Sequence, residues 1–104
     1  MRRRLRNGDE RIDRGYIRVY TNGKWLLKQR VLWERNYGAI PEGYYICFLD
    51  GDRTNLSLEN LACVPVSVLR SVNKTLGHNR HPEITKTLLL IDELERATKE
   101  VRVL

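Results

Sequence analysis

The sequence predicts a small α+β domain with an N-terminal β-hairpin and helix, then a strand-turn-strand-helix unit, and last a C-terminal helix. Three observations support this prediction. Asn22-Gly23 lies between two alternating segments, which is the strongest short signal for a hairpin turn. Asp50-Gly51-Asp52 separates two short apolar runs, and helical periodicity extends over the C-terminal residues. A chain of 104 residues is long enough for one such domain and too short for two.

The first elements are a hairpin and a helix. The hairpin is predicted over residues 15–29, where β-branched residues alternate with polar and aromatic ones. From about residue 29 the pattern becomes helical, and it places Trp33 and Tyr37 one turn apart on the same side. Gly38 is expected to end this helix, because glycine readily takes the conformation that follows a helix C-terminus.

The second half of the predicted fold contains two strands and two helices. Apolar runs predict strands over residues 44–49 and 61–66, joined by the turn. Ser67 is expected to cap a helix that runs to about Leu76, just before a glycine. The final helix is predicted over residues 83–101, with its apolar side chains near one face.

The expected domain organisation is a basic N-terminal arm over residues 1–14, a domain over residues 15–80 that includes the hairpin, and a C-terminal helix over residues 81–104 that packs on it. No apolar run approaches the roughly 20 residues that a membrane helix requires. The first residues carry positive charge without the apolar stretch that a signal peptide has. We therefore expect a soluble, cytoplasmic protein with no membrane partner.

Positive charge is concentrated at the N-terminal end. The whole chain has a net charge of +6, and residues 1–30 alone contribute +7, with ten Lys and Arg against three acidic residues. Basic residues neutralise nucleic-acid phosphates and release their counterions, which gives sequence-independent affinity. We therefore predict DNA as a partner, although residues 1–10 could instead be a solubilising tail. The candidate phosphate contacts are Arg2, Arg3, Arg4, Arg6, Arg14, Arg18, Lys24, Lys28 and Arg30.

The segment that follows the first predicted strand has the composition of a structural turn. Glycine accepts positive φ, and Asp and Asn side chains form hydrogen bonds with nearby backbone groups. Two carboxylates this close could also hold a cation, but no EF-hand spacing follows them, so the turn is the favoured interpretation. The predicted turn residues are Asp50, Gly51, Asp52 and Asn55.

Several separated elements of the sequence resemble a known family. The stretch "KWLLKQRVLWERNYGAIPEGYYICFLDGDRTNLSLENLACV" is similar to the phage and homing-type HNH endonucleases, in which a small strand-turn-strand-helix unit holds one divalent metal. The elements "WE", "G-IPEG", "DGD-TN" and "ENL" match in order and spacing, and "PEITKTLLLIDEL" resembles the tail that follows the motif in phage members. The resemblance spans roughly residues 15–95, and it implies a ββα-metal fold.

The resemblance implies that the catalytic pair of this family falls on Cys47 and Phe48. In those enzymes the first residue of the pair ligates the metal, and the second is a histidine that acts as general base. Phe48 has no proton acceptor and cannot act as a base. The soft sulfur of Cys47 is a poor ligand for Mg²⁺.

The other motif positions are altered in the same way, with one exception. The family's middle Asn falls on Asn60, where it is retained and is expected to hold the loop. The third motif residue, a metal-binding His or Asn, falls on Leu69, which cannot ligate a metal. A helix-borne His of the family falls on Asn73, and a His of the preceding helix falls on Gln29. We therefore expect no retained catalytic residue and no cofactor, with a divalent metal only if the enzyme is active.

A rearranged active site is the main alternative. His78 and His81 could form a nominal zinc set with Cys47 and Cys63, but the sequence has no close cysteine pair. Isolated cysteines in an intracellular protein are more often buried thiols. His78 could also serve as a relocated base, although no carboxylate pattern accompanies it.

The sequence thus predicts an HNH-fold protein, phage encoded by resemblance and located in the host cytoplasm. We expect it to be catalytically inactive or impaired and to bind DNA through its basic N-terminal region. One alternative is an active metal-dependent DNA endonuclease. Another is a regulator that binds a host or phage protein through apolar surface at Phe48, Leu69 and the C-terminal helix, unless these two side chains simply pack together. The oligomeric state stays open.

Overall fold

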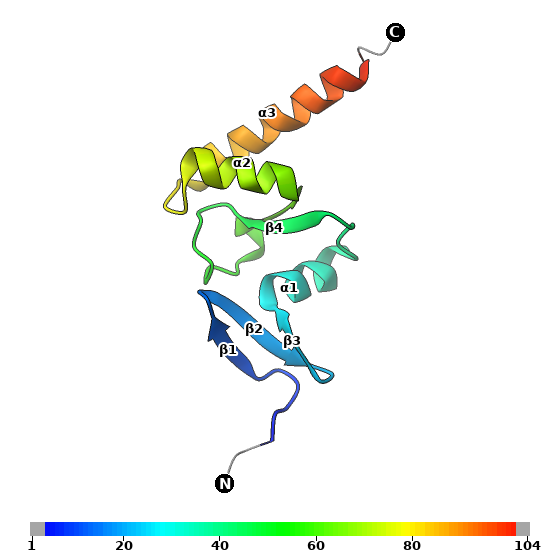
Figure 1. Ribbon diagram of the computed structural model, residues 1–104, viewed down its shortest axis with the longest axis vertical. Helices are drawn as coiled ribbons and strands as arrows, with labels where there is room; N and C mark the ends of the chain where they lie inside the picture. The colour runs from blue at the N-terminus through cyan, green and yellow to red at the C-terminus, as the bar shows by residue number, and fades with distance from the viewer. Residues whose placement is uncertain (1–3, 102–104) are drawn as a thin grey trace.

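The computed structural model describes residues 4–101, with side chains described up to residue 97. It has a three-stranded sheet in the order β1-β2-β3 and a two-stranded sheet formed by β4 and β5, together with three helices and one 3-10 turn (Figure 1). The elements are β1 (Glu10–Asp13), β2 (Tyr16–Thr21), β3 (Lys24–Leu27), α1 (Lys28–Tyr37), β4 (Tyr44–Phe48), the 3-10 turn Leu58–Asn60, β5 (Leu61–Pro65), α2 (Val66–Leu76) and α3 (Pro82–Val101). The predicted α+β fold class is confirmed.

Two tight turns of two residues each join the three strands of the N-terminal sheet. Asn22 and Gly23 join β2 to β3 and have φ values of 47° and 83°, as a type I′ turn requires, so the predicted hairpin is confirmed. Arg14 and Gly15 join β1 to β2 in the same way, with φ values of 53° and 84°. The sequence does not predict β1, because its residues are mostly charged and arginine is uncommon at positive φ. The structure therefore places a paired strand inside the segment predicted as an arm.

The first helix has the predicted end. Gly38 follows α1 with a φ of 94°, and its N–H donates to the carbonyl of Glu34 at 3.0 Å. The rings of Trp33 and Tyr37 lie 4.4 Å apart, one helical turn from each other, as the spacing predicts.

The second sheet and α2 form a strand-turn-strand-helix unit. β4 and β5 pair antiparallel, with Tyr44 opposite Pro65 and Phe48 opposite Leu61. The expected cap at Ser67 is wrong, because α2 begins at Val66 and no side chain caps it. Pro65 lies at the N-cap with a φ of −58°, so the chain turns from the strand into the helix two residues before the serine.

The small sheet lies between two apolar clusters because alternate side chains of β4 point to opposite faces. On one face Cys47 packs with residues of β5 and α2, including Val68 and Val72. On the other face Ile46 and Phe48 pack towards α1 and the N-terminal sheet. In Figure 1, α2 and α3 accordingly lie on one side of β4, and α1 with the first sheet lies on the other.

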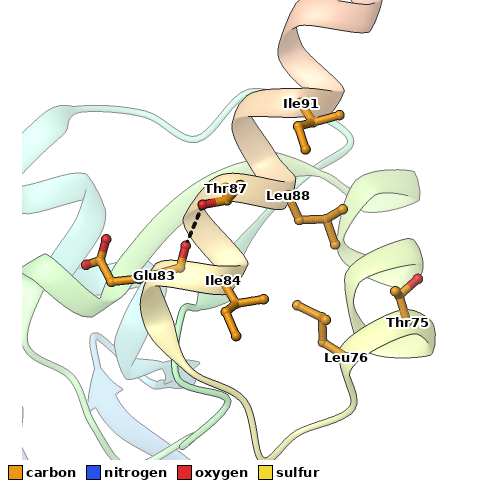
Figure 2. A pocket seen from close by; sticks show the side chains of 7 residues that line it. All are labelled: Thr75, Leu76, Glu83, Ile84, Thr87, Leu88 and Ile91. Atoms are coloured by element: carbon orange, nitrogen blue, oxygen red, sulfur yellow. Dashed lines mark hydrogen bonds between the residues drawn. The ribbon is translucent and has the colours of Figure 1, made fainter.

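The last helix packs on the domain only along part of its length. Leu88 and Leu89 contact the Cys47 cluster, whereas Leu90 and Leu94 are exposed. An apolar groove of about 370 Å³ lies between the end of α2 and the first half of α3, where Leu76 faces Ile84 and Leu88 (Figure 2). Within the described residues, no helix has both the length and the apolar character that crossing a membrane requires.

The turn at Gly51 generates a test of this packing. A Cβ atom on Gly51 would lie 1.8 Å from the carbonyl oxygen of His78, whereas a Cβ on Gly43 would meet nothing within 4 Å. Both glycines have similar left-handed φ values, 77° and 81°. Gly51→Ala should therefore lower the free energy of unfolding by roughly 1–3 kcal/mol more than Gly43→Ala, measured by urea denaturation. Equal losses for the two variants would contradict the close approach of the His78 backbone.

Candidate functional site

The connection between β4 and β5 is organised by one carboxylate. Oδ1 of Asp50 accepts hydrogen bonds from the backbone N–H of Asp52 at 2.8 Å and from Nδ2 of Asn60 at 2.9 Å. Its other oxygen, Oδ2, accepts from Nδ2 of Asn55 at 2.8 Å. Burial raises the pKa of Asp50, but these hydrogen bonds outweigh the effect of burial and hold the pKa below its ordinary value. The carboxylate therefore serves as an ionised acceptor at the centre of the turn.

Asn60 uses its whole amide group to hold the same connection. The side chain is 5% exposed, and its Oδ1 accepts from the backbone N–H of Asp50 at 3.0 Å. Nδ2 donates both to Asp50 and to the carbonyl of Asn55, the latter at 3.0 Å. A buried amide with both its donor and its acceptor groups satisfied is a structural element, so the geometry gives Asn60 a positioning role.

The second carboxylate of the turn is engaged locally. Oδ1 of Asp52 accepts from the backbone N–H of Thr54 at 2.9 Å and from the Thr54 hydroxyl at 2.7 Å. Across the described part of the chain, no group of three or more His, Cys, Asp or Glu residues is arranged to hold a metal ion. The two aspartates thus act as acceptors for turn donors.

Cys47 and Phe48 at the end of β4 are core residues. Cys47 is completely buried, and Phe48 is 5% exposed in a cluster with Ile46 and Leu61. The Phe48 ring lies 6.4 Å from the ring of Tyr16 in β2. Burial of Phe48 therefore leaves very little of its apolar surface available to a protein partner.

Leu69 lies on the Cys47 side of the small sheet. It is half-buried and packs against the cluster that includes Cys47 and Val72. Leu69 and Phe48 both line a small cavity of about 40 Å³, but they belong to different apolar clusters. The two side chains therefore adjoin the same cavity without forming one common core.

Arg80, in the loop between α2 and α3, points its guanidinium group at this same region. Nη2 donates to the carbonyl of Phe48 and to Sγ of Cys47, the latter at 3.4 Å. Nη1 donates to Oδ1 of Asn73 at 2.8 Å. Arg80 was not predicted from the sequence, because it lies 33 positions from Cys47 and no local motif marks it.

The two histidines have different surroundings. Nδ1 of His81 accepts from the backbone N–H of Glu83 at 3.1 Å, at the start of α3. His78 lines the 40 Å³ cavity together with Arg53 and Arg80, and the residues that line it include no carboxylate. The structure does not bring the nominal set Cys47, Cys63, His78 and His81 together as metal ligands within the described residues.

The predicted phosphate contacts fall into three groups. Arg2 and Arg3 lie outside the described residues. Arg18 forms an ion pair with Asp13, Lys28 forms one with Glu10, and Arg30 donates to the carbonyl of Tyr44 at 3.4 Å. The exposed members are Arg4, Arg6, Arg14 and Lys24.

Arg53 joins the N-terminal sheet to the turn that follows β4, and it too was not predicted from the sequence. Its Nη1 donates to the carbonyl of Arg14 at 3.0 Å, and its guanidinium carbon lies 4.5 Å from the centre of the Tyr16 ring. The only sequence signal for it is a basic residue within the turn. Arg53 also lines the small cavity, so this contact links the N-terminal sheet to the cavity.

Comparison with known proteins finds a family match for the middle of the chain. Residues 26–70 match the family model described as HNH endonuclease. This segment of the chain is similar to the HNH endonucleases. A search of curated proteins finds no match, and neither does a search of solved structures. The matched segment covers α1, both strands of the small sheet and the first part of α2, whereas Asn73 and Arg80 lie beyond it.

The residues at the HNH positions do not fit a divalent metal. Burial raises the pKa of the Cys47 thiol, against the lowering effect of the nearby Arg80 charge and hydrogen bond, so the thiol is held in its neutral form. A cysteine binds a metal ion through its thiolate form, not through the neutral thiol. Leu69 has no ligand atom, and Oδ1 of Asn73 already accepts from Arg80.

The core position of Phe48 gives a stability prediction. Phe48→Ala should lower the free energy of unfolding by about 3–5 kcal/mol, because it leaves a cavity between the small sheet and β2. Chemical denaturation monitored by circular dichroism measures the loss. A loss below about 1 kcal/mol would show that the ring is exposed in solution and available to a partner.

The hydrogen bonds of Asp50 predict a pH-dependent difference. In Asp50→Asn, the NH₂ group of the new amide must face one of the donors that now bind the carboxylate. The substitution should therefore lower the free energy of unfolding by about 1–3 kcal/mol at pH 7. Because the folded-state pKa is lowered, the stabilisation is present above the unfolded-state value of about 4 and is lost as the pH falls through the folded-state pKa.

The unfolding free energies of wild type and of Asp50→Asn should therefore converge at acidic pH. Asp52→Asn is the matched control, since Asp52 uses one oxygen for both of its bonds to Thr54 and an amide can keep them. A pH-independent gap between wild type and Asp50→Asn would contradict this account.

Proposed function

We propose that this HNH protein binds DNA without cutting it. The proposal depends on the contact of Arg53 with Arg14 and Tyr16, which joins the N-terminal sheet to the connection between β4 and β5. HNH nucleases act on nucleic acid, so a basic surface beside the family's cleft is suited to a phosphate backbone.

The distribution of charge supports this proposal. Arg14 and Lys24 lie at opposite ends of β2, each exposed in or beside a tight turn, with Arg53 next to the former. Rigid two-residue turns hold these positions at fixed separations, and a fixed array of cations suits a regular backbone of phosphates. Tyr16 and Tyr20 are half-buried against Phe48 and Trp25 respectively, so they support the sheet from within the protein.

The chemistry of the site supports the proposed loss of nuclease activity. Hydrolysis of a phosphodiester by this family requires a base that activates water and a metal that stabilises developing charge. Phe48 at the base position is a buried hydrocarbon, and His78 lies by the cavity without a carboxylate among the other residues that line it. A neighbouring carboxylate is what would orient and charge an imidazole base, so the arrangement does not favour a relocated one.

The proposal predicts DNA binding that persists in EDTA and weakens steeply with salt. The affinity of the double variant Arg14→Asn/Lys24→Gln should fall, and its slope of log affinity against log salt should be smaller by roughly 2 than that of wild type. Asn is chosen at position 14 because it tolerates the positive φ there. Gel-shift titrations at several salt concentrations measure both quantities.

Lys74→Gln is the control, since Lys74 is exposed in the last turn of α2. Figure 1 shows α2 on the opposite side of β4 from the N-terminal sheet. The binding of this control should match that of wild type. The same preparation is incubated with plasmid DNA and Mg²⁺, Mn²⁺, Ni²⁺ or Zn²⁺ in turn, where no nicking is expected. Metal-dependent nicking would overturn the loss of activity, and binding that is insensitive to salt would overturn the proposed surface.

A further inference from the structure

Arg80 uses all three nitrogens of its guanidinium group, and its acceptors come from two separate parts of the chain, residues 47–49 and 73–77. Nε donates to the carbonyl of Leu49 at 3.3 Å, just after β4. Nη2 reaches Phe48 and Cys47 in β4 itself. Nη1 reaches Asn73 in α2 and the carbonyl of Gly77 behind it, at 2.8 Å and 2.9 Å. One cation therefore ties the end of β4 to the end of α2.

One of these acceptors lies at a position where the HNH resemblance places a metal ligand, and another lies at the position of a histidine of the family. Cys47 occupies the ligand position of β4, and Asn73 occupies the position of a helix-borne histidine in α2, one turn after the ligand position Leu69. Both side chains turn their polar atom towards the same guanidinium group. A divalent ion in the family and Arg80 in this chain would thus bridge the same strand and the same helix.

We infer that Arg80 is a built-in cation that replaces the divalent metal of the HNH unit. The acceptors it uses are neutral carbonyl, amide and thiol groups, which suit a single positive charge carried by several N–H donors. A divalent ion at this place would meet the Arg80 charge at short range, and the residues that line the cavity include no carboxylate to compensate it. This inference concerns the metal position alone and does not depend on DNA binding.

The replacement also accounts for how α3 is joined to the site. The carbonyl of Leu49 accepts from Nε of Arg80 and from the hydroxyl of Thr85, the latter at 2.7 Å. Thr85 is completely buried in the first half of α3. The loop that carries Arg80 is therefore fixed to β4 at both the arginine and the following helix.

The first test compares melting temperatures. Arg80→Ala should lower the melting temperature by about 10 °C or more, because several charge-assisted hydrogen bonds are lost. Arg80→Lys should give an intermediate loss, since a single ammonium group cannot span β4 and α2 as the fork does. Arg70→Ala is the control, because Arg70 is exposed on α2 and should change the melting temperature by no more than about 2 °C. Wild type should melt at the same temperature in Mn²⁺, Zn²⁺ and EDTA.

The second test asks whether Arg80 keeps a metal out. The double variant Cys47→His/Asn73→His presents two imidazoles to the site while Arg80 remains, and the triple variant adds Arg80→Ala. We expect the folded triple variant to bind Co²⁺, followed by its visible absorption, at least tenfold more tightly than the double variant.

Each of several results would overturn the inference. These are equal Co²⁺ affinity for the folded double and triple variants, a wild-type melting temperature raised by Mn²⁺ or Zn²⁺ and restored by EDTA, or unchanged melting in Arg80→Ala. If circular dichroism shows that the triple variant does not fold, the inference is tested instead by comparing the melting temperatures of Arg80→Lys and Arg70→Lys. A larger melting shift for Arg80→Lys supports the inference, and equal shifts overturn it.

Discussion

The amide of Asn60 and the carboxylate of Asp50 are the interaction on which the rest of the site depends. Together they accept from the backbone N–H groups of Asp50 and Asp52 and from the Asn55 amide, and they donate to the Asn55 carbonyl, within the long irregular connection over residues 49–60. They are also joined to each other by a hydrogen bond. With this connection fixed, Gly51 can lie against the backbone of His78 and the carbonyl of Leu49 can face Arg80. The same connection places Arg53 under the first hairpin turn. A polar network of two side chains thus positions both the basic surface and the loop that carries Arg80.

Local chemistry in the sequence was sufficient for most of the fold. The Asn22-Gly23 turn and the ends of α1 and α2 at glycines depend on neighbouring residues only, and these predictions are confirmed. The β1 strand was not predictable, because its pairing partner rather than its own composition makes it a strand. The cap at Ser67 was wrong, since the proline before it already sets the backbone at the helix start.

The candidate site was predictable only in part, for a related reason. Motif spacing located Cys47, Phe48 and Asn60, and the chemistry of these side chains could be assessed directly from their types. Arg80 could not be found in this way, because its role arises from contacts with residues 31 to 33 positions away. Arg53 was missed for the same reason, since its partner Arg14 is 39 positions distant. Long-range contacts between a basic side chain and backbone carbonyls leave no pattern in a single sequence.

The two tight turns of the N-terminal sheet have a consequence for the order of folding. Strands joined by two residues close small loops, so the β1-β2-β3 meander can form early at a low cost in chain entropy. The contacts of Leu49 with Arg80 and Thr85 instead join residues more than 30 positions apart and must await the two later helices. On a ribosome the cationic sheet would emerge first, well before the segment that completes the HNH unit. The nascent chain would thus present its cationic sheet before its HNH-like unit is assembled.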